Sequence, residues 1–373
     1  MIVLLHMQGY FGDLPALAHF TLTQGVCFFY VLSGFILTYA YPQLDRREAA
    51  RFFVGRFARI APLYLVALLL YVLILPAWFR DSVSSITPAS AVLTLLLLQA
   101  WVPIYRVQTA FNGVSWSLSA EWFFALCFPL LLWRWRQTWV CKLALTLVLV
   151  AGMIAIANYG SGRLPPTVEA RDLVYFHPLA RLWEFALGMT TAHLWRALYP
   201  RLRYGRGIGT ALEAGALGVT FAVMAGSGEW SRQAGQSALV GPGGEAWLAS
   251  SGWVCLPFAA LILVIGLERG WITQLLSLRP FVLLGEISFA LYLLQLLVFH
   301  CYALHPEPFM ATPPWLLHLG GGCLLLLVAY VGWALVEVPA RRAIMRLWKR
   351  YEARDLALTG RLQRTPATVT PTR

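Results

Sequence analysis

Long runs of apolar residues follow one another along this chain, separated by short polar connections. A transmembrane α-helix needs roughly 20 mostly apolar residues, and several runs reach that length. The clearest are 57–79, 139–158, 246–267, 281–303 and 315–336. Strands of a membrane barrel would instead alternate apolar and polar positions in segments of about 10 residues. The pattern therefore predicts an all-α, polytopic transmembrane helical bundle.

The basic residues indicate how many of the apolar segments cross the membrane. Weaker segments lie at 1–12, 22–41, 88–104, 115–133, 176–196 and 207–226. Cytoplasmic connections carry an excess of Lys and Arg, and the connection 42–56 is rich in Arg. If every segment crossed, the basic blocks after 133 and after 196 would lie outside. The segment 88–104 is short and contains Gln99 and Pro103, so we expect it to be re-entrant or interfacial. About ten crossings, with both termini cytoplasmic, then place the basic blocks inside.

The composition agrees with a membrane protein. Hydrophobic residues make up 59% of the chain and charged residues 12%, against about 25% charged in soluble domains. The net charge of +12 comes mainly from arginines between apolar runs, which argues against nucleic-acid binding. The six cysteines lie within or beside apolar segments without metal-ligand spacing. They are typical of small buried apolar residues, so we predict no metal site.

The chain divides into one large membrane part and a short tail. We predict a single transmembrane domain over 1–348 and a cytoplasmic, polar, disordered tail over 349–373. The segment 1–12 is only about half a transmembrane span, since about 17–25 residues are needed. Yet 22–41 must begin outside if its basic end is to lie inside. We therefore expect the first helix to be truncated, with a natural start upstream of Met1.

Ionisable groups within the apolar segments are candidates for function, because charge inside a membrane is expensive. His6 lies in the first segment, and imidazole exchanges protons near neutral pH. Glu121 begins the fifth segment, where it needs a polar environment. Arg181 and Glu184 lie three residues apart on one helical face, so they can instead neutralise each other as a structural pair. Three further groups lie near helix ends, where a structural role is favoured: Glu213, Glu286 and His300.

Two arginines enter the third apolar segment from its predicted cytoplasmic end. Arg56 and Arg59 are three residues apart in RFARIAPLY and so project from one face. Ordinary positive-inside charge would explain their sign. A phosphate clamp is the alternative, because guanidinium groups match phosphate oxygens with two parallel hydrogen bonds.

Six motifs in order resemble the acyltransferase 3 family of bacterial membrane O-acyltransferases. A histidine in the first helix precedes a G-V-x-x-F-F-V-x-S-G-F stretch in that family. The motifs stand here as His6, GVCFFYVLSGFILT, RFARIAPLY, WSLSAEWFF, RLWEFALGM with LGEISFALYLLQ, and VEVPARR, spanning His6 to Arg342. The late motif often ends in Y-L-x-H in the family, whereas this chain has Gln295 there. The family also carries an Arg eleven residues before the His, a position that precedes Met1.

The resemblance implies roles for particular residues. His6 and Glu121 would be catalytic, with His6 taking the proton from an acceptor hydroxyl. The residues that would bind the donor acyl-CoA are Arg56, Arg59 and Tyr64. Those that would bind the acceptor are Trp116, Ser117, Arg181 and Glu184. An acyl-histidine intermediate is a variant that the sequence leaves open.

The resemblance implies an O-acyltransferase of the bacterial cytoplasmic (inner) membrane. It would move an acyl group, acetyl in the first instance, from acyl-CoA to a hydroxyl of a glycan or lipid-linked carbohydrate. Acyl-CoA would be a substrate rather than a permanently bound cofactor, and membrane lipid would surround the protein. The alternative is a transporter of an acylated lipid, sugar or acyl group, which would need no thioester donor. Neither the acceptor, the acyl chain length nor the oligomeric state follows from the sequence.

Overall fold

The computed structural model describes residues 1–76, 86–159, 165, 167–309 and 311–362, and the described residues contain helices but no strands. Residues 77–79 of the third predicted segment lie outside the described residues. The α-helices are α1 (Ile2–Phe11), α2 (Gly25–Ala40), α3 (Arg46–Ile74), α5 (Pro88–Leu95), α6 (Tyr105–Gln108), α7 (Trp116–Leu132), α8 (Trp135–Tyr159), α9 (Pro178–Leu198), α10 (Arg206–Gly235), α11 (Gly241–Trp247), α12 (Cys255–Gly266), α13 (Trp271–Leu276), α14 (Arg279–Leu304), α15 (Pro314–Gly332) and α16 (Val338–Leu362). The prediction of an all-α fold is confirmed.

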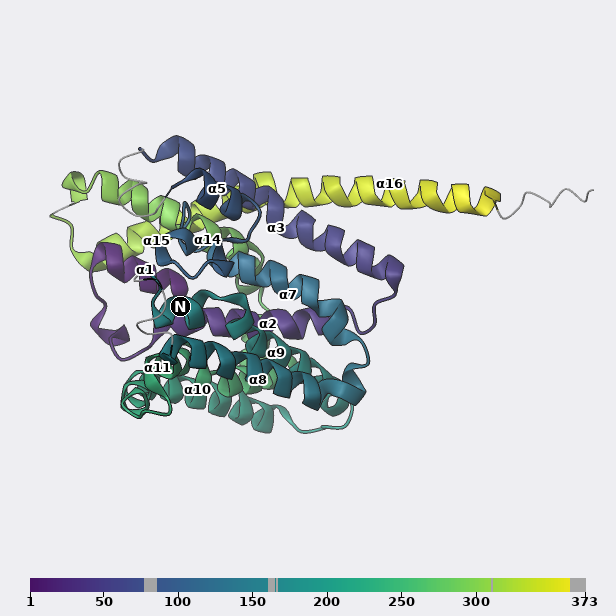
Figure 1. The fold of residues 1–373 in the computed structure, drawn as a ribbon, viewed down its shortest axis with the longest axis horizontal. Helices are drawn as coiled ribbons and strands as arrows, with labels where there is room; N and C mark the ends of the chain where they lie inside the picture. Colours follow the sequence, from purple (N-terminus) through teal and green to yellow (C-terminus); the bar gives the residue numbers. More distant parts are fainter. Residues whose placement is uncertain (77–85, 160–164, 166, 310, 363–373) are drawn as a thin grey trace, which may run out of the picture.

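Seven helical stretches among the described residues are long and apolar enough to cross a membrane. They are Leu22–Ala40, Glu48–Ile74, Trp135–Tyr159, Arg206–Gly235, Gly241–Gly266, Arg279–Leu304 and Pro314–Arg354. α1 and α7 are shorter apolar helices, and α9 adds 21 residues that include charged ones. The chain is thus a multi-pass membrane protein. Figure 1 shows α2, α9 and α8 running side by side, with α3 and α14 on the other side of the bundle.

The segment 88–104 is not one continuous helix. α5 has eight residues, about 12 Å of helix at 1.5 Å per residue, which is far too short to span a bilayer. Leu97 then adopts a left-handed conformation with φ of 56°, and a short 3₁₀ turn, η3 (Gln99–Trp101), follows. A segment that does not cross was expected here.

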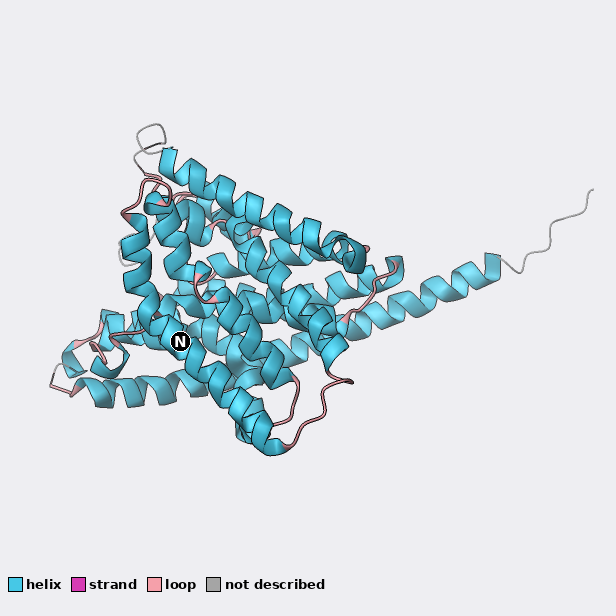
Figure 2. Ribbon diagram, turned by 90° about the horizontal axis from the view of Figure 1, so that it is seen from below, coloured by secondary structure: helices cyan, strands magenta, loops and turns pink. Residues whose placement is uncertain are grey.

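Three segments are more helical than predicted. α3 begins at Arg46, so most of the connection 42–56 is helix. Its start is fixed by a capping box between Asp45 and Glu48. The connection 227–245, between two predicted apolar segments, is largely helical. α10 continues to Gly235, and the Ser227 and Ser231 hydroxyls donate to carbonyls of the preceding turn. α16 continues to Leu362, past the predicted boundary at 349, and projects beyond the bundle in both views (Figures 1 and 2). Residues 363–373 of the predicted tail lie outside the described residues.

α2 and α9 form the most extensive helix pair of the bundle, and two glycines allow their close approach. A Cβ added at Gly188 would lie 1.9 Å from the carbonyl oxygen of Val31, and one at Gly34 would lie 2.0 Å from that of Phe185. Helices in membranes associate closely where small residues face each other. The same crossing holds Ser33 on α2, next to Gly34, in a fixed position.

We expect Gly188→Ala to lower the free energy of unfolding by about 1–3 kcal/mol, because the added methyl group must push α2 and α9 apart. Denaturant unfolding in detergent micelles measures the change. Gly152→Ala on α8 is the matched control, since a Cβ there meets nothing within 4 Å. Equal stability of Gly188→Ala and the unmodified protein would contradict this account of the crossing.

Candidate functional site

A cavity of about 590 Å³ lies between α1, α2, α3, α7 and α14. Most of its lining is apolar, with side chains such as Phe29, Leu32, Ile60 and Phe289. Its polar lining residues are Ser33, Arg56, Arg59, Glu121, Ser288 and Tyr292. The cavity therefore combines a mostly apolar lining with a few convergent polar groups, as binding sites for small molecules generally do.

Arg56 on α3 and Glu121 on α7 form an ion pair at the wall of this cavity. Ser33 on α2 donates a hydrogen bond of 3.2 Å to the same Glu121 oxygen, Oε1. The three helices α2, α3 and α7 thus meet at one carboxylate, which is buried. Burying a carboxylate is tolerable when it is paired and hydrogen-bonded. The predicted donor-binding Arg56 and the predicted catalytic Glu121 are therefore direct partners.

Arg59, one turn further along α3, is paired with a second buried carboxylate. Glu337 is fully buried and forms an ion pair with it, and the Arg59 guanidinium also lies 5.7 Å from the centre of the Phe289 ring. The Arg59 side chain is 30% exposed, against 16% for Arg56. Arg59 is thus the more accessible of the two arginines, and each is already neutralised by one glutamate.

His6 on α1 faces Gln295 on α14, with 3.2 Å between His6 Nδ1 and Gln295 Oε1. The amide nitrogen of Gln295 donates to the carbonyl oxygen of Tyr292 at 2.8 Å, which fixes the amide orientation. Since Oε1 can only accept, Nδ1 of a neutral His6 must carry the proton. The other ring nitrogen, Nε2, then bears the free lone pair that a general base requires. It makes no hydrogen bond with any described residue.

The His6–Gln295 pair lies one helical turn beyond the cavity. Val3, three residues before His6, and Tyr292, three residues before Gln295, both line the cavity. The Tyr292 hydroxyl lies 2.8 Å from Ser117 Oγ and donates to the carbonyl oxygen of Val114 at 3.1 Å. Ser117 does not line the cavity itself, but it contacts Tyr292, which does.

Arg181 and Glu184 form a separate, fully buried cluster. Their ion pair is 2.7 Å long, and Ser251 hydrogen-bonds to both side chains. The guanidinium also lies over the rings of Tyr30 and Tyr175, 5.6 Å and 5.1 Å from their centres. Neither charged residue lines the cavity. This geometry favours the structural pair over direct contact with an acceptor.

Two other predicted site residues lie in the hydrophobic core. Tyr64 is buried, and its hydroxyl donates to the carbonyl oxygen of Thr94, joining α3 to α5. Trp116 is also buried and packs against Tyr175 and Phe176, with ring centres 5.0 Å and 4.7 Å apart. The structure brings neither residue to the cavity.

Three π-helical turns supply partners to Arg59 and Arg181, and the sequence indicated none of these turns. The turn η7 (Trp333–Glu337) carries the partner of Arg59. The turn η5 (Leu248–Gly252) carries Ser251, and η4 (Asp172–Phe176) carries Tyr175, both of which contact Arg181. A π turn holds one extra residue and is frequent at functional sites. Ser33, Gln295 and Glu337 are further site residues without an assigned role in the sequence reasoning.

Packing also brings together two cysteines from distant parts of the chain. Cys27 Sγ lies 3.3 Å from Cys255 Sγ, and a Glu184 oxygen lies within 4.8 Å of both in a buried group with metal-ligand chemistry. The guanidinium of Arg181 pairs with that same glutamate. Because a cation there would be repelled by Arg181, the charges favour a packed thiol pair over a metal site.

Comparison with known proteins finds a family model that matches most of the chain. The family model described as an acyltransferase domain matches residues 1–334. The chain is 30% identical to acyltransferase MdmB of Streptomyces mycarofaciens over 208 residues. This match covers 51% of this chain and 52% of that protein. It is 24% identical over 288 residues to O-acetyltransferase OatA of Staphylococcus aureus, covering 72% of this chain and 44% of that protein. The chain spans about half the length of the curated relatives it matches. No solved structure matches.

Proposed function

Because the chain belongs to the acyltransferase 3 family, we propose that it moves an acyl group from acyl-CoA to a hydroxyl of a glycan or lipid-linked carbohydrate. The observation that carries the proposal is the His6–Gln295 pair next to the cavity. It presents an imidazole nitrogen that has no hydrogen-bond partner among the described residues, and an ionisable group inside a membrane protein is a candidate for function because it is costly to place there.

His6 Nε2 takes the proton of the acceptor hydroxyl as the hydroxyl oxygen attacks the thioester carbonyl carbon. The carbon–sulfur bond then breaks, and the departing thiolate of CoA receives the proton from His6. The products are an ester and free CoA. Gln295 positions His6 by fixing its tautomer. Attack by His6 itself, which would form an acyl-histidine, uses the same nitrogen.

The cavity fits the donor. Its apolar lining suits the acyl and pantetheine part of acyl-CoA, and Arg59 suits a phosphate group because its guanidinium is partly exposed. Arg56 is paired with Glu121, which also accepts a hydrogen bond from Ser33, so we assign Arg56 to shaping the cavity wall. Glu121 then acts by holding Arg56 rather than by exchanging protons with the acceptor.

The direction of the helices indicates the side from which each substrate reaches His6. α1 and α14 run from the cavity towards the His6–Gln295 pair, and Arg56 lies near the basic start of α3. If that start is cytoplasmic, as the positive-inside rule favours, the donor enters from the cytoplasm and the acceptor reaches His6 from the opposite side. The protein would then act in the bacterial inner membrane with both termini in the cytoplasm.

Purified protein in liposomes, supplied with acetyl-CoA labelled on its acetyl group, tests the proposal. We expect free CoA to appear together with label in the glycan or lipid fraction of added bacterial membranes. A transporter would leave the thioester intact, because moving an acylated compound needs no bond cleavage. If neither free CoA nor labelled glycan or lipid appears with any acceptor fraction, the assignment as an acyl-CoA-dependent enzyme is wrong.

A further inference from the structure

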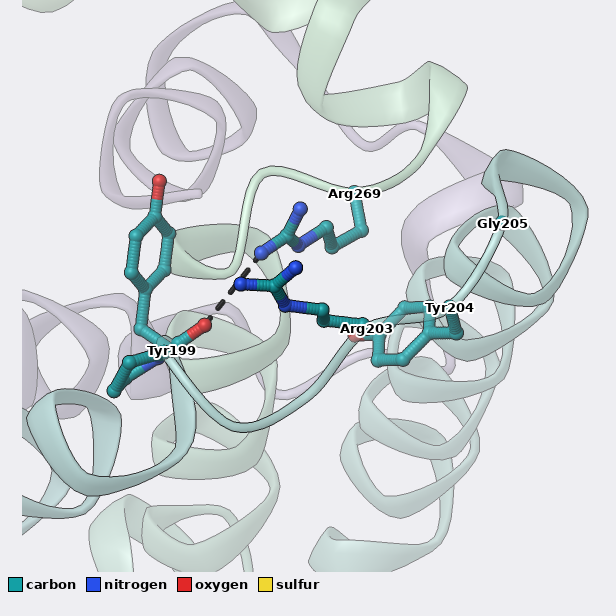
Figure 3. A pocket seen from close by; sticks show the side chains of 6 residues that line it. Tyr199, Arg203, Tyr204, Gly205 and Arg269 are labelled. Carbon is teal, nitrogen blue, oxygen red and sulfur yellow. Dashed lines mark hydrogen bonds between the residues drawn. The ribbon is translucent and has the colours of Figure 1, made fainter.

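A second cavity, of about 630 Å³, opens at one end of the bundle, away from the candidate active site. It lies between the α9–α10 connection and the α12–α13 connection and is lined by Tyr199, Pro200, Arg203, Tyr204, Gly205 and Arg269. Figure 3 shows the guanidinium groups of Arg203 and Arg269 next to each other, beside the backbone of Tyr199. Arg269 Nη2 donates to the Tyr199 carbonyl oxygen at 3.5 Å.

The two arginines lack a carboxylate partner in the described part of the chain. None of the ion pairs there involves Arg203 or Arg269, and Arg269 Nε is buried without a hydrogen-bond partner. The nearby Glu213 pairs with neither arginine. It accepts hydrogen bonds from the backbone of Gly270 and Ile272 and from the Thr273 hydroxyl instead. Two adjacent guanidinium groups repel each other, so an anion between them would stabilise this arrangement.

The cavity lies at the end of the bundle where α2 and α9 both end. Arg196, at the end of α9, donates to the carbonyl oxygens of Thr38 and Tyr39. The cavity is therefore at the same end of the bundle as the basic α2–α3 connection. Trp271 is exposed beside it, with the Arg206 guanidinium 5.3 Å from the centre of its ring. Trp and Tyr are enriched at the level of the lipid headgroups.

Exposed apolar side chains continue from the cavity along the helices that border it. Ile208 and Leu212 on α10, and Leu275 and Leu276 on α13, are each more than 40% exposed. A ligand with a negatively charged head and apolar chains would match both features. A soluble phosphate would match only the arginines.

We propose that this cavity binds the phosphate group of an anionic phospholipid, held between Arg203 and Arg269, with the acyl chains along α10 and α13. Guanidinium groups match phosphate oxygens through parallel, charge-assisted hydrogen bonds. Basic pockets between helices on the cytoplasmic side are known to suit anionic lipid headgroups. The site is separate from the candidate active site, so it does not rest on the proposed acyl transfer.

Phosphatidylglycerol binding to the purified full chain, measured by native mass spectrometry and in phosphatidylcholine nanodiscs doped with phosphatidylglycerol, tests this site. We expect Arg203→Gln to weaken binding about tenfold or more, which is the effect of losing one charge-assisted hydrogen bond to the phosphate group. Arg203→Gln combined with Arg269→Gln should weaken it further. Arg201→Gln removes the same charge from the same connection without lining the cavity, so it should retain binding.

Two outcomes would overturn the proposal. Binding that is equal in Arg203→Gln, the double variant and Arg201→Gln would show that the cavity holds no lipid phosphate. Inorganic phosphate that binds in pure phosphatidylcholine nanodiscs as tightly as phosphatidylglycerol, and is lost in the same variants, would identify a soluble anion instead. Arg203 is exposed, so its single substitution keeps the test valid even if the double variant folds poorly.

Discussion

Replacing His6 by alanine is expected to lower the rate of acyl transfer about 10²–10⁴-fold, the contribution of a positioned general base. The reason is that Nε2 is the group we assign to the hydroxyl proton, and alanine offers no substitute. The rate of CoA release from acetyl-CoA in the presence of acceptor membranes measures the effect. The variant should still insert and elute as a single folded species, because the His6 side chain makes one hydrogen bond within the described part of the chain.

Two further variants separate the chemistry from the fold. His19→Ala removes an exposed histidine in the connection after α1, and it should leave the rate unchanged. Gln295→Leu keeps His6 but removes the partner that fixes its tautomer, so we expect a smaller loss of rate with unchanged protein stability. Full activity of His6→Ala would show that the base lies elsewhere. Equal losses in His6→Ala and His19→Ala would point to general damage.

Removing one member of the Arg181–Glu184 pair is expected to cost about 3–5 kcal/mol of stability. Both side chains are fully buried, so Glu184→Leu leaves an uncompensated guanidinium in the core. Denaturant unfolding in detergent micelles measures the free energy of unfolding. Because the pair also holds Ser251 on η5 and packs on Tyr30 of α2 and Tyr175 of η4, the loss should spread to α2, η4 and η5.

The double substitution Arg181→Leu with Glu184→Leu distinguishes a structural pair from an acceptor site. Replacing both charges by apolar groups removes the buried charge entirely, so stability should largely return. For a structural pair, acyl transfer should return with it. A stable double variant that has lost acyl transfer would instead assign the pair to binding or catalysis. The exposed Arg232–Glu229 pair is the matched control, since surface ion pairs contribute about 0–1 kcal/mol.

The membrane helices could be predicted because a bilayer admits few solutions. Backbone polar groups in hydrocarbon must be satisfied within a helix, so each long apolar run became one. The errors concern the connections. Arginines suggested a connection at 42–56, and Gly and Pro suggested one at 227–245. Hydroxyls that bond to the preceding turn, as in Ser231, nevertheless allow a helix to continue there. Hydropathy alone does not record such local bonds.

The candidate site was only partly predictable for a different reason. Arg56, Glu121 and His6 stood out because charge within an apolar run needs an explanation. Their partners are set by packing between helices that are far apart in the sequence, 289 residues for His6 with Gln295 and 278 for Arg59 with Glu337. The π turns add a second obstacle, since one extra residue rotates the following side chains and has no clear sequence signature.

The matched charges at the first cavity also bear on the electrical insulation of the membrane. Arg56 with Glu121 and Arg59 with Glu337 leave no net charge on these groups. Moving one unit charge across a potential of 100 mV changes its energy by about 2.3 kcal/mol. A cavity with unbalanced charge would attract counter-ions, and this potential would drive them. Balanced charges attract counter-ions less and still leave Arg59 accessible to a phosphate group. The charge balance therefore limits the pull of a membrane potential on ions near this hollow.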